Sequence, residues 1–194
     1  YQTENIVLDE VDAQGRRRRS EGFADDDLGG AFVRLYERYA ELLPDGPALA
    51  RAAATARSIA AMLDPPDVDR YGAALAPAAE YVDHRTLGLG SMHGAKGMLR
   101  ATGALLEVAT DLTTRIDDVL ALRSDALLVR RTNFGTDRVG GGAYERPFLL
   151  LLIFGADGLV SRWEQFDVDR DGEGLARFDE LTCEPNRFRH SREG

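Results

Sequence analysis

Apolar positions in the second half of the chain are grouped into four stretches of strand length. The four stretches are Leu112 to Leu122, Ala126 to Thr136, Arg146 to Phe154 and Leu159 to Phe166. Short polar or Gly-rich segments separate them, among them Gly140-Gly141-Gly142, and such segments are typical of hairpin connections. The pattern therefore predicts an antiparallel meander of four strands.

The first half of the chain spaces its apolar residues as helices do, every three or four positions. Helices are expected at 28–43, 48–63, 68–75 and 95–109, and one more after the last strand at 171–181. A single strand, Ala78 to Arg85, is expected among them. Helices on one face of a strongly bent antiparallel sheet form a cone with an open end, so the element order predicts an α+β fold of that shape.

One stretch of sequence occurs twice in the same register. Residues 11–23 match residues 154–166, and identical pairs continue at Asp26/Asp169, Gly29/Gly172, Arg34/Arg177 and Glu37/Glu180. Both copies indicate a strand, a Gly turn, a second strand, an acidic break and a helix. We therefore expect residues 1–43 to be the C-terminal remnant of a preceding like module, residues 44–182 a complete module, and residues 183–194 a tail. A chance match is the alternative, because Gly and acidic residues are common at turns and helix starts.

Composition narrows the classes of partner. A net charge of −9 argues against a nucleic-acid or anionic-membrane surface. The longest apolar run, Phe148 to Phe154, is too short to span a membrane. Cys183 is the single cysteine and no signal peptide is evident, so a cytoplasmic location is expected. Lys96 is the single lysine, and the abundance of Arg, Ala and Gly suggests a bacterial source.

Cofactor and metal motifs are not evident in the sequence. The three histidines, His84, His93 and His190, are isolated from one another and from Cys183, so no metal site is expected. No dinucleotide-binding fingerprint occurs, and no cofactor is expected. The basic run Arg16 to Arg19 is interpreted as a solvated edge hairpin in preference to a phosphate site.

Several segments resemble one known family. They are Tyr81-Val-Asp-His-Arg85, Leu127-Leu-Val-Arg130, Glu145-Arg-Pro-Phe148 and Gly158-Leu-Val-Ser-Arg-Trp-Glu-Gln-Phe166. Together they resemble the SnoaL-like branch of the nuclear transport factor 2-like superfamily over about residues 48–180. The resemblance implies a cone and a homodimer formed through the open sheet face. The family includes cyclases, ketosteroid isomerases, dehydratases and epoxide hydrolases, and also binding or dimerisation modules without chemistry, so fold alone does not select a function.

Candidate catalytic residues lie on the strand from Ala78 to Arg85. Because side chains alternate along a strand, Tyr81 and Asp83 share one face and His84 takes the other. If the first face lines the cone, Asp83 could act as a general base with Tyr81 stabilising an oxyanion. If the second does, His84 is the candidate base. The alternative is that Asp83 pairs with Arg85 and His84 is structural; no local motif matches the family's catalytic Asp.

Candidate ligand-binding residues lie on the later strands: Arg130, Glu145, Trp163 and Glu164. Whichever of Arg130 and Arg131 faces inward needs a carboxylate partner or an anionic ligand, and Glu145 and Glu164 are the expected partners. Trp163 and Glu164 point in opposite directions. Facing inward, Trp163 would form a pocket wall; facing outward, it would fill a dimer interface.

Two function classes follow from these features. The first is a small-molecule-binding or dimerisation accessory module of a larger bacterial multidomain protein, with a small hydrophobic ligand, a second copy and the other domains as partners. The second is an isomerase, cyclase or dehydratase acting on a hydrophobic carbonyl compound. A cavity on the order of a few hundred cubic ångströms with converging polar groups would favour the enzyme, and a filled cone would favour the module.

Overall fold

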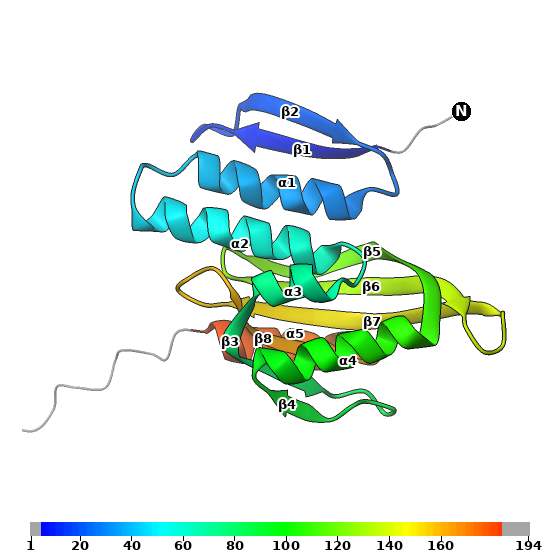
Figure 1. Ribbon diagram of the computed structural model, residues 1–194. Helices are drawn as coiled ribbons and strands as arrows, with labels where there is room; N and C mark the ends of the chain where they lie inside the picture. Colours follow the sequence, from blue (N-terminus) through cyan, green and yellow to red (C-terminus); the bar gives the residue numbers. More distant parts are fainter. Residues whose placement is uncertain (1–4, 184–194) are drawn as a thin grey trace, which may run out of the picture.

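The computed structural model describes residues 5–183, in which helices lie on both faces of a six-stranded sheet (Figure 1). The strands are β3 (Leu75–Asp83), β4 (Ser91–His93), β5 (Ala109–Arg123), β6 (Ala126–Asp137), β7 (Ala143–Phe154) and β8 (Val160–Phe166). The helices that pack on this sheet are α2 (Pro47–Leu63), α3 (Val68–Ala74), α4 (Ala95–Val108) and α5 (Asp171–Thr182). The predicted α+β class and the curved sheet covered by helices are confirmed.

The sheet has the strand order β4-β3-β8-β7-β6-β5 and is mixed. Its later strands form the predicted antiparallel meander, but β3 pairs in parallel with β8. The prediction of a wholly antiparallel sheet is therefore wrong at this pair. A long connection that contains a helix allows β3 to run in the same direction as its neighbour. The predicted loop after β3 also contains a short strand, β4, which pairs Met92 with Tyr81.

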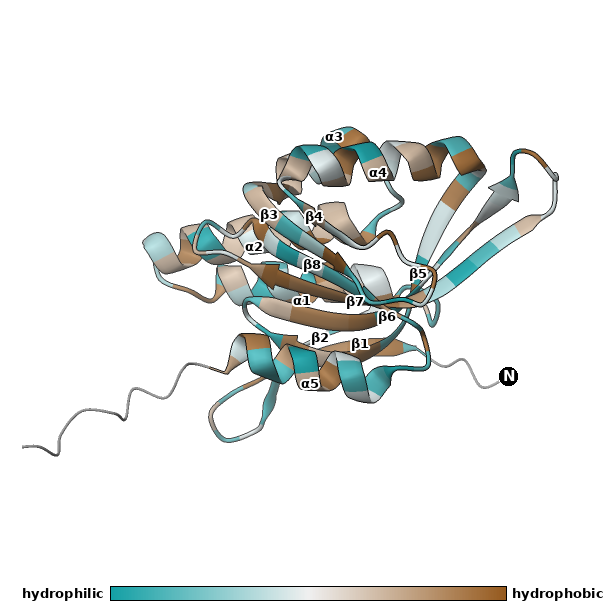
Figure 2. Ribbon diagram, turned by 90° about the horizontal axis from the view of Figure 1, so that it is seen from below, coloured by the Kyte–Doolittle hydropathy of each residue, from teal (hydrophilic) through white to brown (hydrophobic). Residues whose placement is uncertain are grey.

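The central strands are buried on both faces, which explains the unbroken apolar run in β7 (Figure 2). Leu150, Leu152 and Phe154 point to the cone side, beneath α2, α3 and α4. Leu149 and Leu151 point to the other side and pack with Phe178 of α5. Alternate residues of one strand therefore serve two separate cores.

The sheet face implied for a homodimer is covered by α5 over β6 and β7. Leu128 lies in the core beside α5, whereas Leu150, Leu152 and Trp163 lie in the cone, and all four are buried within one chain. Helix α5 packs on the sheet face that the family resemblance implied would be open to a second copy. Trp163 faces inward, which leaves the alternative of an outward Trp163 in a dimer interface wrong. A homodimer through another surface stays a prediction.

The N-terminal segment forms a separate layer. Strands β1 (Ile6–Val11) and β2 (Arg17–Phe23) make a two-stranded sheet that packs on helix α1 (Leu28–Glu41), and α1 packs in turn on α2 (Figure 1). The side chain of Asp27 accepts a hydrogen bond from Gly30 N–H and caps α1. The basic run in β2 is exposed, as predicted for a solvated hairpin. No helix within residues 5–183 is both long enough and apolar enough to cross a membrane.

Candidate functional site

The cone side of β3 and β8 carries the predicted polar residues and the tryptophan. The parallel pairing sets Tyr81 beside Trp163 and Asp83 beside Gln165. All four side chains point away from α5, and Tyr81, Trp163 and Gln165 are each more than nine-tenths buried. The alternation of β3 therefore settles which face lines the cone: it is the face of Tyr81 and Asp83.

Asp83 is fully engaged by hydrogen bonds. Arg85 donates to it from Nε at 2.6 Å and from Nη2 at 2.5 Å, and the Leu89 N–H donates at 2.8 Å. Burial raises the pKa of Asp83, but these donors more than offset it and lower the pKa to about 2. A carboxylate stabilised in this way is a weak proton acceptor at neutral pH.

Tyr81 adds a further donor to the same cluster. Its hydroxyl lies 3.0 Å from Asp83 Oδ2 and 3.2 Å from Gln165 Oε1. Burial, followed by the charge of Asp83, raises the pKa of Tyr81, so the phenol stays neutral. Because one hydroxyl donates one proton, only one of the two oxygens accepts from Tyr81 at a time.

Two small cavities lie between this cluster and helix α4. Their volumes are about 60 and 40 Å³, and they share five lining residues: Thr102, Leu105, Arg146, Trp163 and Gln165. Both are far below the volume of a typical ligand pocket. The interior is filled mainly by aromatic and aliphatic side chains, with a polar patch at the α4 side.

The indole N–H of Trp163 has no acceptor. Its Nε1 is buried and without a hydrogen-bond partner in the part of the chain that the structure describes. The indole ring packs edge-on against Tyr71 and Tyr81, each at 5.6 Å between ring centroids. Since buried donors are almost always satisfied, this one calls for an explanation.

Arg131 faces the cone. Backbone carbonyls and an amide oxygen accept the hydrogen bonds of its guanidinium, in place of the carboxylate that was expected. Its guanidinium donates to Met62 O at 2.5 Å, Asp64 O at 3.2 Å and Asn133 Oδ1 at 3.1 Å. The prediction that Glu145 or Glu164 would neutralise the inward arginine is wrong. The α2 helix ends directly above Arg131, and its last carbonyls need donors.

Arg130 and Glu145 lie outside the cone. Arg130 points to the α5 side, where it donates to both carboxylate oxygens of Asp171 at 2.9 and 3.0 Å. Glu145 is exposed on β7. The structure therefore does not bring these two candidate ligand residues together with Trp163.

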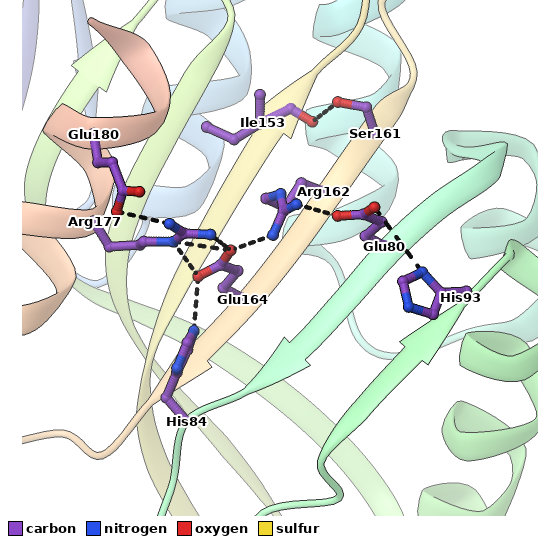
Figure 3. Close-up of polar contacts among 9 residues, drawn as sticks. All are labelled: Glu80, His84, His93, Ile153, Ser161, Arg162, Glu164, Arg177 and Glu180. Atoms are coloured by element: carbon purple, nitrogen blue, oxygen red, sulfur yellow. Dashed lines mark hydrogen bonds and ion pairs between the residues drawn. The ribbon is translucent and has the colours of Figure 1, made fainter.

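His84 and Glu164 belong to a separate network on the α5 side (Figure 3). Glu164 is fully buried and lies 2.8 Å from His84 Nε2, 2.8 Å from Arg162 Nη1 and 3.0 Å from Arg177 Nη2. His84 also stacks on Phe166 at 4.5 Å. This network is a structural ion-pair cluster, and neither residue reaches the cone.

Sequence reasoning missed two residues of the cone site, Arg146 and Gln165. Gln165 follows Trp163 by two positions, and Arg146 precedes the buried Phe148 by two, so strand alternation alone would have placed both on the cone face. Within residues 5–183 no group of three potential metal-binding side chains occurs.

A larger surface hollow lies elsewhere. Its volume is about 260 Å³, and it lies between α1 and the end of β5, where Leu35, Tyr39 and Leu122 give it an apolar lining. Arg123 is its one charged lining residue, so no acid and base converge there. The cone cluster is therefore the better candidate for a specific site.

Comparisons with known proteins show a likeness of fold. A scan against models of protein families and a search of curated proteins both find no match. Among solved structures, an LEH-like epoxide hydrolase from M. tuberculosis is 19% identical with a TM-score of 0.46, and the alignment covers 64% of this chain and 91% of that one. A protein from Jannaschia sp. CCS1, described as a SnoaL-like polyketide cyclase, is 18% identical with a TM-score of 0.44, covering 61% and 80%.

A third similar structure is a protein with a ketosteroid isomerase-like fold from Catenulispora acidiphila, in complex with trimethylamine. It is 15% identical with a TM-score of 0.42, and the alignment covers 70% of this chain and 94% of that one. The chain is thus similar in fold to SnoaL-like and ketosteroid isomerase-like proteins, the group that its sequence resembles.

Proposed function

We propose that this protein is a small-molecule-binding module whose cone takes a short ligand with an acceptor oxygen. The observation that carries the proposal is the buried, unbonded indole N–H of Trp163, a residue that lines both cavities. A buried donor without a partner costs about 1–3 kcal/mol. A ligand oxygen that accepts a hydrogen bond from Trp163 would remove that free-energy cost. The site would therefore favour ligands that carry an acceptor.

The charges around the cavities favour a carboxylate over a neutral acceptor. Arg146 lines both cavities, and no ion pair or hydrogen bond within the described range 5–183 engages its guanidinium. Arg131 lines the second cavity and is bonded to neutral acceptors alone. The carboxylate of Asp83 is matched by Arg85. The cone therefore has an excess of positive charge, which an anionic ligand would balance.

Titration of Trp163 fluorescence tests this proposal, because Trp163 is the single tryptophan. We expect a saturable change with propionate, and binding of the isosteric propionamide at least about tenfold weaker, which corresponds to about 1.4 kcal/mol. The Arg146→Gln variant should lose about tenfold in propionate affinity and keep its affinity for the amide. Arg100→Gln removes the same charge from an exposed position on α4 and should change neither. No saturable response to any short acid would contradict the proposal.

The enzyme class is the second candidate, and the same cluster argues against it. Asp83 is the one predicted base on the cone side, and its pairing with Arg85 holds its pKa at about 2. The cavities are also small for a carbonyl substrate together with a reacting base. Both features favour binding over proton abstraction.

Substitution of Asp83 by Asn separates the two classes. We expect Asp83→Asn to lower the free energy of unfolding by about 2 kcal/mol, since it leaves the buried Arg85 guanidinium without its charge partner. Urea unfolding at pH 7 measures the effect. Because the folded pKa is depressed, the contribution is present above the unfolded value of 3.8 and is lost as the pH falls toward 2. A loss of about 100-fold or more in turnover of a carbonyl compound, with stability unchanged, would instead support the enzyme.

We also propose that residues 1–43 end a preceding like module and that residues 44–182 form a complete one. The support is the repeated sequence and the separate sheet that β1 and β2 form. This arrangement makes the chain part of a tandem-repeat multidomain protein. A homodimer remains a further proposal, which sedimentation of the 44–182 fragment at micromolar concentration would test.

A further inference from the structure

The N-terminal hairpin reproduces the geometry of β7 and β8 residue by residue. In the first hairpin Ile6 pairs with Phe23, Leu8 with Glu21 and Glu10 with Arg19. In the second, Leu149 pairs with Phe166, Leu151 with Glu164 and Ile153 with Arg162. Both hairpins shift register at the same place, between Glu10 and Val11 and between Ile153 and Phe154. The matching turn glycines, Gly15 and Gly158, have φ of 76° and 77°.

The ion pairs between hairpin and helix are repeated as well. Arg34 of α1 lies 2.9 Å from Glu21 and 3.4 Å from Glu37, and Arg19 lies 2.7 Å from Glu21. The second copy has three equivalent pairs: Arg177–Glu164 at 3.0 Å, Arg177–Glu180 at 2.7 Å and Arg162–Glu164 at 2.8 Å. A chance match of turn residues would not reproduce a three-part side-chain network in the same register.

The hairpin β1–β2 lacks the neighbouring strands that flank the hairpin β7–β8. Strand β8 pairs in parallel with β3, which brings His84 onto Glu164. Strand β2 pairs with β1 alone, so within residues 5–183 no strand covers its outer edge and no histidine reaches Glu21. The outer edge of β1 is also unpaired within residues 5–183, whereas the equivalent edge of β7 pairs with β6.

The exposed face of the hairpin is the face that should lie inside a cone. Val7 and Val11 occupy the positions of Leu150 and Phe154 and are 55% and 56% exposed, whereas Leu150 and Phe154 are 0% and 3% exposed. On the opposite face, Ile6 and Leu8 are partly covered by α1, as Leu149 and Leu151 are by α5. Asp9 lies between the two valines on the same face, where it pairs with Arg17 at 3.1 Å and accepts a hydrogen bond from Ser20 Oγ at 2.5 Å. Within residues 5–183 the apolar positions of this face, Val7 and Val11, are therefore uncovered.

We infer that the outer edge of β2 and the Val7–Val11 face bind the missing part of a second cone, supplied by the same polypeptide ahead of Tyr1. The inference rests on the tandem arrangement proposed above. A strand equivalent to β3 lies parallel to β2 and places a hydrogen-bond donor on Glu21, as His84 does on Glu164. Helices equivalent to α2, α3 and α4 cover Val7 and Val11.

A second copy of this chain does not supply these parts. Its β3 is already held between β4 and β8, and its β6 between β5 and β7. Either strand would have to leave a completed sheet to reach β2 or β1.

The test compares this chain with a longer protein, which is expressed from the same reading frame and starts upstream of Tyr1. In the extended protein we expect backbone amides of β2 to exchange at least about 100-fold more slowly than in this chain, because a neighbouring strand protects them. Val7→Asp should lower the thermal midpoint of the extended protein by several degrees and leave that of this chain unchanged. Val139→Asp, at a loop position that is 98% exposed, is the matched control and should change neither protein.

Three results would overturn the inference. One is that the backbone amides of β2 exchange at the same rate in the extended protein as in this chain, and that Val7→Asp leaves the thermal midpoint of both proteins unchanged. Another is that the amides of β2 are protected from exchange in this chain and lose that protection on dilution. That result would show that a second copy pairs with the outer edge of β2. The third is an upstream sequence without a module of helices and strands. None of these readouts involves the cone ligand, so the Trp163 titration can succeed or fail independently.

Discussion

Replacing Glu164 by Gln is expected to lower the free energy of unfolding by about 3 kcal/mol. The Glu164 side chain is fully buried and accepts from Arg162, Arg177 and His84. Gln keeps the shape but removes the charge, so the two guanidinium groups lose their common partner. Urea unfolding at pH 7 measures the change.

The matched control for this variant is Glu21→Gln in the N-terminal hairpin. Glu21 pairs with the equivalent residues Arg19 and Arg34, but its side chain is 23% exposed. Water compensates the loss of a pair near the surface, so we expect Glu21→Gln to change the free energy of unfolding far less than Glu164→Gln does. Equal effects of the two substitutions would contradict the view that Glu164 is the buried member of the repeated network.

The Glu164 network also makes the stability of the protein depend on pH in the acid range. Burial raises the pKa of Glu164, but hydrogen bonds from Arg177, Arg162 and His84 outweigh burial and leave the pKa below its usual value. A depressed folded pKa contributes stability that is present above the unfolded value of 4.5 and is lost as the pH falls through the folded pKa. The stability difference between Glu164→Gln and the parent protein should therefore shrink below about pH 4.5.

The second large effect is expected for Gly158→Ala, at about 3 kcal/mol. Gly158 has φ of 77°, and a Cβ there would lie 2.6 Å from Ala54 Cβ and 2.7 Å from Arg51 O, both on helix α2. Left-handed backbone disfavours Ala, and the helix backbone cannot move aside as a flexible side chain could.

Gly15→Ala isolates the backbone part of that cost. Gly15 has nearly the same φ, 76°, and nothing within 4 Å of its added Cβ. We expect about 1 kcal/mol for this variant. Chemical denaturation of both variants gives the difference, and equal losses would show that the contact between the β7–β8 turn and α2 is looser than the structure indicates.

Element order and strand boundaries could be predicted because they depend on local patterns. The apolar run Phe148 to Phe154 and the turn at Gly158 place β7 and β8 without knowledge of the rest of the chain. The parallel pairing of β3 and β8 could not be predicted in this way. It depends on where a strand returns after α4 and three further strands, and local alternation contains no information about that path.

The candidate site could be predicted in part for the same reason. Alternation separated Tyr81 and Asp83 from His84, and Trp163 from Glu164, and the structure confirms both separations. It could not indicate that Asp171 on α5 would pair with Arg130, or that the end of α2 would satisfy Arg131 with carbonyls. Those partners come from helices that meet the sheet only in the folded protein.

The most direct test of the binding proposal is the indole resonance of Trp163 in a ¹H–¹⁵N correlation spectrum. With a single tryptophan, this side-chain signal needs no further assignment. Because its N–H has no acceptor in the structure, we predict that titration with propionate moves the proton signal downfield along a saturable curve. The Arg146→Gln variant should require about tenfold more propionate. An indole signal that stays in place while short carboxylates are raised to high concentration would contradict the proposal that the cone binds an acceptor oxygen at Trp163.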